Sequence, residues 1–138
     1  MNETDTVSGI DIEDLTGPLI MILDDDQFSG QLCMTFLRHH HPAVFFSNPD
    51  DAVAFSKVHA LGVILLDIDL GGGLRGEEVL AALRQSELNR NTPVIAVTGF
   101  TDEAEKREIL QAGFTGFLPK PFTRNEILQL IRDFIPDS

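Results

Sequence analysis

The sequence predicts an α/β protein built on a doubly wound, five-stranded parallel sheet with helices on both faces. Three observations support this fold class. Five short apolar runs alternate strictly with five segments of helical spacing, and the runs are apolar throughout instead of at every second residue. Continuous apolar runs are typical of strands buried on both faces. Strict alternation of strands and helices favours parallel strands joined by right-handed crossovers.

The five expected strands are short. Each apolar run has the length of a strand and is too short for a helix. For the third run periodicity alone does not separate a buried strand from a piece of buried helix, and the glycines that follow it favour the strand. The runs occupy residues 19–23, 43–46, 63–66, 94–97 and 116–118.

The first helix is expected directly after the first strand. Phe28, Leu32 and Phe36 recur at every fourth position and form an apolar stripe along one side of a helix that runs to about His40. Cys33 lies in the same segment and is the only cysteine, so it forms no internal disulfide. We interpret it as a core residue in a reducing compartment.

Four further helices carry recognisable start or stop signals. Residues 48–51 supply an N-terminal cap, a proline at the first helical position and early acids, so a helix follows through 53–58. An acidic start and an apolar stripe describe a third helix over 77–83. A fourth begins at 101–103 and ends at Gly113, because glycine favours the left-handed cap. Residues 123–126 form a capping box for a fifth.

The composition fits one globular domain behind an acidic arm. Residues 1–17 are polar, acidic and closed by a Gly-Pro pair, so we expect a flexible arm, with 18–138 as the domain. The formal net charge is −12, from 10 basic and 22 acidic side chains, which argues against direct nucleic-acid binding. There is no apolar run of about 20 residues and no secretory signal, so we expect a cytoplasmic protein away from membranes.

Chemically active side chains follow four of the five strands. Asp24–Asp26 follow the first, Asp67 and Asp69 the third, Thr98 the fourth and Lys120 the fifth. In open parallel sheets ligands bind at the carboxyl ends of the strands, where the strand order reverses. We therefore expect these groups to meet in one small site.

Such a site suits a divalent cation and a phosphoryl group. Clustered carboxylates repel one another at neutral pH unless a cation joins them, and oxygen ligands without His or Cys favour Mg²⁺. The ammonium of Lys120 and the hydroxyl of Thr98 would then face a phosphoryl group. Because no Ser, Cys or His stands among these strand-end groups, the nucleophile would be a carboxylate, and Asp67 ends the central strand.

Four motifs together resemble the receiver domain of two-component response regulators. They are ILDDDQ at 22–27, ILLDIDL at 64–70, VTGF at 97–100 and FLPKPF at 117–122, in order and at sensible spacing over 18–135. The resemblance implies a flavodoxin-like fold with strand order 2-1-3-4-5, the order of a known member of this family. It also implies a switch in a histidine-to-aspartate phosphorelay.

The resemblance assigns the metal and phosphoryl chemistry to particular carboxylates. Asp67 is the implied phosphoacceptor. Asp24 and Asp25 match the acidic pair that holds Mg²⁺, with Asp25 as the more direct ligand and Asp24 acting partly through water. Asp69 stands two positions after the acceptor, where the family uses the backbone carbonyl as a metal ligand.

The resemblance also assigns the switching groups. Thr98 matches the hydroxyl that moves to bind the phosphoryl oxygen, and Lys120 matches the lysine that pairs with it. Lys120-Pro121 resembles a dipeptide that the family often holds in cis. Phe117 falls on the aromatic switch position, although simple packing remains an alternative for it.

The chain departs from the family pattern at two places. Gly71 replaces the usual proline after the acceptor, and Gly76 arrives nine residues after the acceptor, so the loop is one residue longer and more flexible. Asp69 and Phe100 occupy the two positions that vary in the family and tune the lifetime of the phosphoryl group. We expect an altered lifetime without assigning its direction.

Simpler interpretations compete with some of these assignments. Asp24–Asp26 would also serve as a helix N-cap cluster, and His39–His41 fit the end of a helix better than a metal site. Gly71–Gly73 lack a following Gly-Lys-Ser/Thr and read as a plain loop.

The expected function is a phosphorylation-dependent protein switch. Partners would be a sensor histidine kinase or histidine phosphotransfer protein and a downstream effector, with the chain a monomer or a weak dimer through the fourth helix, fifth strand and fifth helix. Apart from catalysing its own phosphorylation and dephosphorylation it would not be an enzyme. The alternatives are a phosphate-independent interaction module, a fragment of a longer regulator or hybrid kinase, and an aspartate-dependent phosphohydrolase, for which the chain has no substrate-capping segment.

Overall fold

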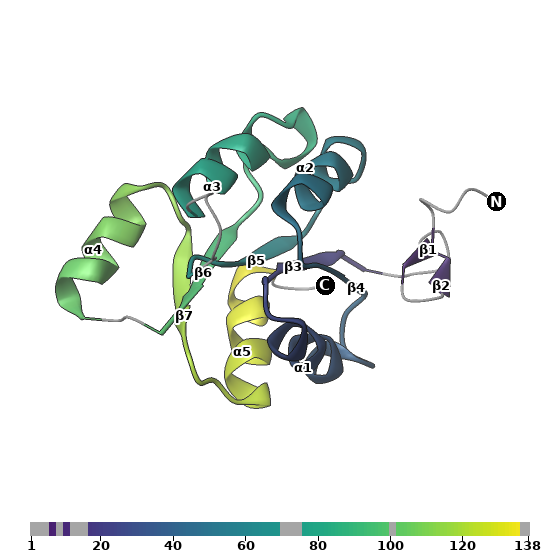
Figure 1. Cartoon of the computed structure of the whole chain (residues 1–138). Coiled ribbons are helices and arrows are strands. Elements are labelled where there is room, and N and C mark those ends of the chain that lie inside the picture. The colour runs from purple at the N-terminus through teal and green to yellow at the C-terminus, as the bar shows by residue number, and fades with distance from the viewer. Residues whose placement is uncertain (1–5, 8–9, 12–16, 70–75, 100–101, 136–138) are drawn as a thin grey trace.

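A computed structural model describes residues 6–7, 10–11, 17–69, 76–99 and 102–135. Its centre is a five-stranded sheet in the order β4-β3-β5-β6-β7, with every neighbouring pair parallel (Figure 1). Counted within this sheet, the order is 2-1-3-4-5, so the predicted fold class is confirmed. The strands are β3 (Ile20–Leu23), β4 (Ala43–Phe46), β5 (Val63–Asp67), β6 (Val94–Thr98) and β7 (Gly116–Pro119).

The five strands match the predicted apolar runs to within one residue at each end. Three of them extend one residue further at the carboxyl end than the runs indicate. In β5 and β6 the added residues are Asp67 and Thr98, so these two polar groups are the last members of buried strands. Their backbone positions are therefore fixed by the sheet.

The helices follow the strands in the predicted alternation. Asn48 caps α2 by accepting a hydrogen bond from Asp50 N–H at 2.7 Å, and Thr123 forms the predicted capping box with Glu126. Gly113 adopts a positive φ of 109° after α4, as the sequence predicts. The helices are α1 (Gln27–Leu37), α2 (Pro49–Val58), α3 (Gly76–Arg84), α4 (Glu103–Gln111) and α5 (Arg124–Phe134).

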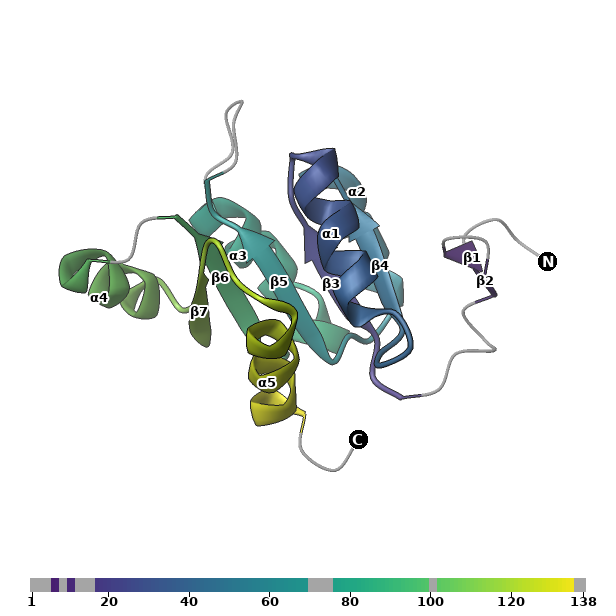
Figure 2. The ribbon, with the colours of Figure 1, turned by 90° about the horizontal axis from the view of Figure 1, so that it is seen from below.

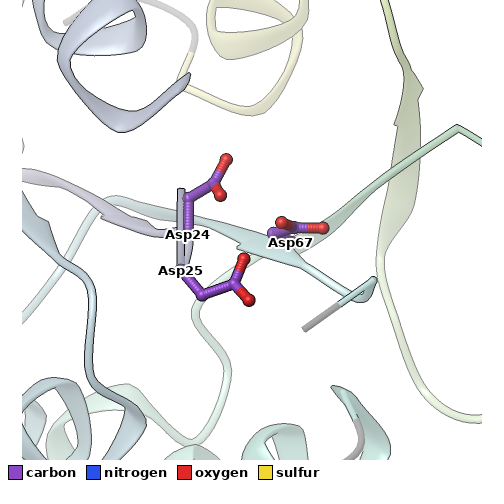
Figure 3. Close-up of side chains that lie close together, drawn as sticks. All are labelled: Asp24, Asp25 and Asp67. Carbon is purple, nitrogen blue, oxygen red and sulfur yellow. The ribbon is translucent and has the colours of Figure 1, made fainter. Parts of the chain in front are cut away.

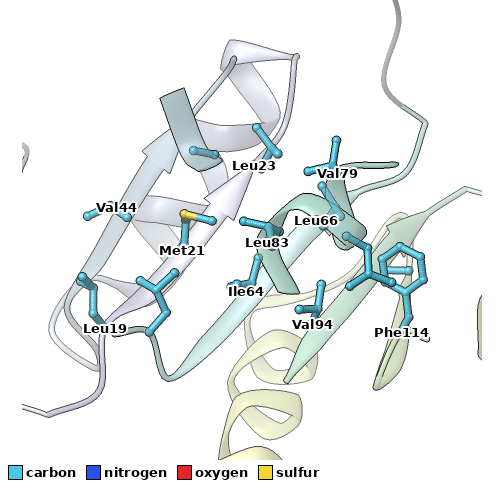
Figure 4. Packing of buried hydrophobic residues seen from close by; sticks show 14 of the residues in the cluster. Leu19, Met21, Leu23, Val44, Ile64, Leu66, Val79, Leu83, Val94 and Phe114 are labelled. Carbon is cyan, nitrogen blue, oxygen red and sulfur yellow. The ribbon is translucent and has the colours of Figure 1, made fainter. Parts of the chain in front are cut away.

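Two apolar layers hold the helices against the sheet. Because side chains of a strand alternate between faces, alternate residues of β3 and β5 enter different layers. Helices α2, α3 and α4 lie on one face and α1 and α5 on the other (Figures 1 and 2). Figure 4 shows the first layer, where Met21, Ile64, Leu66 and Leu83 are almost completely buried. Cys33 is buried in the second layer, as expected for a core residue.

The apolar stripe expected on the first helix is mostly exposed, and the helix ends at Leu37 instead of about His40. α1 buries Gly30, Cys33 and Leu37, whereas Phe28 is 77% exposed and Leu32 is 42% exposed. The small Gly30 allows close approach to the sheet, since a Cβ there would lie 2.1 Å from the ring of Phe45. Of the three residues in the expected stripe, only Phe36 packs against the core, where it is half-buried beside the second layer. The helix ends at Leu37, and the chain then turns towards β4 through a positive φ at His39.

Two features of the structure were not predicted. A short 3₁₀ helix, η3 (Glu87–Asn89), follows α3. Its completely buried Asn89 donates to the carbonyls of Ser56 and His59 and accepts from Leu61 N–H, which ties the end of α2 to the start of β5. In the predicted arm, β1 (Thr6–Val7) and β2 (Ile10–Asp11) pair antiparallel.

Candidate functional site

Three carboxylates meet at the carboxyl edge of the central strands. Asp24 and Asp25 directly follow β3, and Asp67 ends the neighbouring β5 (Figure 3). One carboxylate oxygen from each of the three lies within 4.8 Å of the others. Asp24 and Asp67 are buried, at 4% and 3% exposure, whereas Asp25 is exposed. The structure thus brings together the acidic residues that the sequence predicts to form one site.

The competing N-cap interpretation applies to a different member of the acidic run. Asp26 is the N-cap of α1 and accepts a hydrogen bond from Phe28 N–H at 3.0 Å. Asp24 accepts one from Asp26 N–H at 2.9 Å, which fixes the direction of its side chain. With Asp26 occupied by the cap, Asp24 and Asp25 are the two acids that face Asp67.

Burial strongly affects the ionisation of Asp24. Loss of hydration, together with the nearby Asp67, raises the pKa of its carboxyl to about 6 from an ordinary value of 3.8. The hydrogen bond from Asp26 N–H and the charge of Lys120 act in the opposite direction and are outweighed. A site with too much negative charge for its surroundings is one that a divalent cation would stabilise.

Lys120 supplies the positive group on the other side of Asp67. It follows β7, and its Nζ lies 3.2 Å from Asp67 Oδ1. Burial alone would lower the pKa of this ammonium, but the carboxylates of Asp67, Asp24 and Asp69 outweigh that effect, and the net shift is upward. The Lys120-Pro121 bond is cis, as the resemblance implied.

Asp69 makes contacts that sequence reasoning did not anticipate. Its Oδ2 accepts a hydrogen bond from Gly99 N–H at 3.0 Å, and its Oδ1 lies 3.4 Å from the Thr98 hydroxyl. The sequence identified Thr98 and Asp69 as site residues but gave no sign that they touch. The Gly99 amide was missed altogether, because any residue type carries a backbone N–H.

The aromatic candidate lies next to the site within the sheet. Phe117 is half-buried on β7, where it pairs with Ala96 of β6, two positions before Thr98. Lys106 of α4 places its Nζ 5.4 Å from the centre of the Phe117 ring, a cation–π distance. Phe117 therefore links the strand that carries Thr98 to α4.

Two expectations concern residues outside the described part of the chain. One is the role of Phe100 in tuning the lifetime. The other is the longer loop with its glycines, Gly71–Gly73.

Three clustered acids, one of them paired with a half-buried lysine, match a known family on this sheet topology. The model of the response regulator receiver domain matches residues 20–132. The chain belongs to the response regulator receiver domain family. It is a signalling domain of two-component systems, and the resemblance of its four motifs is confirmed.

Curated relatives include both short and long proteins. The polar-differentiation response regulator DivK of Brucella anthropi is 26% identical over 120 residues, which cover 86% of this chain and 97% of DivK. The transcription factor SKN7 of Saccharomyces cerevisiae is 29% identical over 119 residues, which cover 86% of this chain and 19% of SKN7. The receiver chain thus corresponds to nearly all of one relative and to about a fifth of the other.

Solved structures of receivers share the fold. The chemotaxis response regulator CheY4 of Vibrio cholerae superposes with a TM-score of 0.79 at 23% identity, covering 86% of this chain and 99% of CheY4. The receiver domain of the sensor histidine kinase PA1611 from Pseudomonas aeruginosa has a TM-score of 0.77 at 26% identity, covering 87% and 98%. That structure carries a magnesium ion coordinated in its active-site cleft.

The donor set of this chain fits magnesium. All three clustered side chains offer carboxylate oxygens, and neither histidine nor thiolate stands among them. Mg²⁺ prefers such hard oxygen ligands and retains several waters, which the exposure of Asp25 permits.

Among the described helices none is both long and apolar enough to cross a bilayer.

Proposed function

We propose that this receiver domain accepts a phosphoryl group on Asp67 and uses it to switch a protein-binding surface. The observation that carries the proposal is the 3.2 Å ion pair between Asp67 and Lys120 beside the acidic cluster. An anionic nucleophile is there flanked by a cation on one side and by metal-type ligands on the other. This arrangement neutralises the charge that builds up in phosphoryl transfer.

The reaction forms one bond and breaks another. A carboxylate oxygen of Asp67 bonds to phosphorus, the P–N bond to the donor histidine breaks, and its electron pair stays on the imidazole nitrogen. Lys120 holds the acceptor oxygen and then pairs with the phosphoryl oxygens. Burial of Asp67 limits competing attack by water.

Asp24 and Asp25 would hold Mg²⁺ together with Asp67 and the backbone carbonyl of Asp69. The ion would supply charge neutralisation at the phosphoryl oxygens. Asp24 must lose its proton for this role, and the hydrogen bond from Asp26 N–H supports the charged form.

The switch would run through Thr98 and Phe117. The Thr98 hydroxyl ends β6 at the site, and Phe117 lies on the adjacent β7 against α4. A shift of Thr98 towards the phosphoryl group would change the space available to Phe117, and with it the face made by α4, β7 and α5.

The partners follow from this chemistry. A sensor histidine kinase or a histidine phosphotransfer protein would be the donor, and an effector protein would bind the switched face. The domain would catalyse its own phosphorylation and dephosphorylation without turning over other substrates. The proposal includes a cytoplasmic location, which fits a free, buried Cys33.

Intact mass spectrometry after incubation with acetyl phosphate tests the proposal. We expect one added phosphoryl group in the presence of Mg²⁺, none with EDTA and none in Asp67→Asn. Asp133→Asn removes an exposed acid remote from the acidic cluster and serves as the matched control, with full labelling expected. Labelling of Asp67→Asn to the wild-type level would refute Asp67 as the acceptor, and no labelling of the wild type would favour a phosphate-independent interaction module.

A further inference from the structure

The carboxylate of Asp69 engages two consecutive donors at the end of β6. Oδ2 accepts from Gly99 N–H at 3.0 Å, and Oδ1 lies 3.4 Å from the Thr98 hydroxyl. One carboxylate therefore spans the two groups with its two oxygens. Its own backbone N–H donates to Asp67 Oδ1 at 2.9 Å, so Asp69 is tied to the acceptor as well.

These two donors also lie at the end of the strand next to Asp67, where they could reach a phosphoryl group on it. Asp67 pairs with Val97 in the β5–β6 register, so Thr98 and Gly99 follow directly on the neighbouring strand. Lys120 N–H donates to the Thr98 carbonyl at 2.8 Å, which holds this edge next to the lysine. A phosphoryl group bound to Asp67 needs hydrogen-bond donors for its three outer oxygens. The Asp69 carboxylate already contacts two such donors, the Thr98 hydroxyl and the Gly99 amide.

We propose that Asp69 is a positioning residue whose carboxylate competes with the phosphoryl group for the Thr98 hydroxyl and the Gly99 amide. This inference rests on the proposed function of Asp67. Before phosphorylation, Asp69 holds the end of β6 through the contacts that the phosphoryl group would later make. After phosphorylation, the new negative charge repels the carboxylate, which is exposed and free to turn into solvent.

Competition of this kind has a defined consequence for phosphoryl binding. Both contacts must be broken before the donors can serve the phosphoryl group. The 3.0 Å bond from Gly99 N–H has a charged acceptor and is the stronger of the two. Asp69→Ala removes both contacts and a like charge from the site. The Asp69 backbone carbonyl, the implied metal ligand, is retained in this variant.

The first test uses the complete chain without metal or phosphate donor. In NMR spectra, the Gly99 amide proton of the wild type should resonate downfield of its position in Asp69→Ala, and it should exchange with solvent more slowly. Asp69→Asn keeps an acceptor oxygen without the charge and should fall between the two. An unchanged Gly99 amide in Asp69→Ala would refute the contact on which the proposal depends.

The second test measures binding of beryllofluoride, a phosphoryl analogue, in the presence of Mg²⁺. We expect Asp69→Ala to bind it about tenfold more tightly than the wild type, as expected from the release of one charged hydrogen bond. Asp133→Ala removes a charge far from the site and should bind like the wild type.

The outcomes separate the inference from the proposed function. If the Gly99 amide shifts but Asp69→Ala and wild type bind equally, Asp69 is a structural contact only and the competition is refuted. Equal tightening in Asp133→Ala would attribute the effect to net charge and also refute it. If neither wild type nor Asp69→Ala binds beryllofluoride, the proposed function of Asp67 fails, and the competition fails with it.

Discussion

Three consecutive aspartates of this chain do three different things. Asp24 is buried and faces Asp67, Asp25 is exposed at the same cluster, and Asp26 caps α1. Their chemistry is identical, so the difference comes from where the backbone points as β3 ends and α1 begins. A residue's role at this site is set by its position relative to the strand end.

The raised pKa of Asp24 predicts a pH-dependent stability in metal-free protein. Its folded pKa of about 6 exceeds the ordinary 3.8, so folding favours the protonated form, and its contribution to stability falls as pH rises from about 4 to 6. Asp24→Asn removes this charge and retains an oxygen for Asp26 N–H. We expect the variant to be more stable than the wild type by roughly 1–2 kcal/mol at pH 7, with little difference at pH 4.

Urea unfolding at several pH values, with EDTA present, measures this difference. Adding Mg²⁺ should stabilise the wild type and have a much smaller effect on Asp24→Asn, because the ion binds the ionised cluster. A constant difference between the two proteins from pH 4 to pH 7 would contradict the assignment.

Cys33 provides a second prediction at the residue scale. Burial, together with the nearby Asp24, raises the pKa of its thiol to about 12. The thiolate is the reactive form, so the folded protein should react with Ellman's reagent at least about a hundredfold more slowly than the protein in urea. Rapid modification under native conditions would show that α1 opens from the sheet much more readily than its packing implies.

Residue roles could be predicted where a side chain type and its place at a strand end both carry information. Asp67 and Lys120 are examples, because a charged residue beside a buried strand needs a partner. The Asp69 contacts could not be predicted, since they depend on the direction of an exposed side chain. The role of the Gly99 amide could not be predicted either, because a backbone N–H is not specific to one residue type.

At the scale of elements, α1 shows how a helix can bury its smaller residues. Its inner side carries Gly30, Cys33 and Leu37, and its larger Phe28 and Leu32 face outward. Periodicity detects an apolar stripe, but α1 has two, and the one with the larger side chains is the more exposed. The deciding factor is the ring of Phe45 on β4, which leaves room only for glycine.

This assignment of faces predicts opposite results for two substitutions on α1. Leu37→Ala empties a fully buried position and should lower the free energy of unfolding by about 2–4 kcal/mol. Phe28→Ala, at an exposed position, should change it by less than about 0.5 kcal/mol. Denaturant unfolding of both variants measures these changes. A larger loss of unfolding free energy in Phe28→Ala than in Leu37→Ala would show that the Phe28 side of α1 is the buried one.

The other elements were predictable because their signals are local. The caps of α2 and α5 rest on Asn48 and Thr123, whose side chains bond to backbone N–H groups within three residues. Asn89 is different, since its partners Ser56 and Leu61 lie about 30 residues away. No local sequence pattern predicts hydrogen bonds between residues so far apart in the chain. The 3₁₀ helix η3, which carries Asn89, was missed for the same reason.

At the scale of the whole molecule, the sheet places Thr98 closer to β7 than to β4. β6 carries Thr98 and pairs with β7, and α4 contacts β7 near Phe117. β4 and α2 lie at the far edge of the sheet, beyond β3. A change at the end of β6 therefore has a short route to α4 and β7 and a longer one to α2.

Hydrogen exchange of the complete chain should reveal this asymmetry. On adding Mg²⁺ and beryllofluoride, we expect exchange to change severalfold in peptides covering the end of β6, α4 and β7, because Thr98 and Phe117 alter their contacts there. Peptides of β4 and α2 should change little, and Asp67→Asn should show no change anywhere. Equal changes of exchange in α2 and α4 would mean that the site affects the stability of the whole domain. That result would contradict the α4–β7–α5 face as the switched surface.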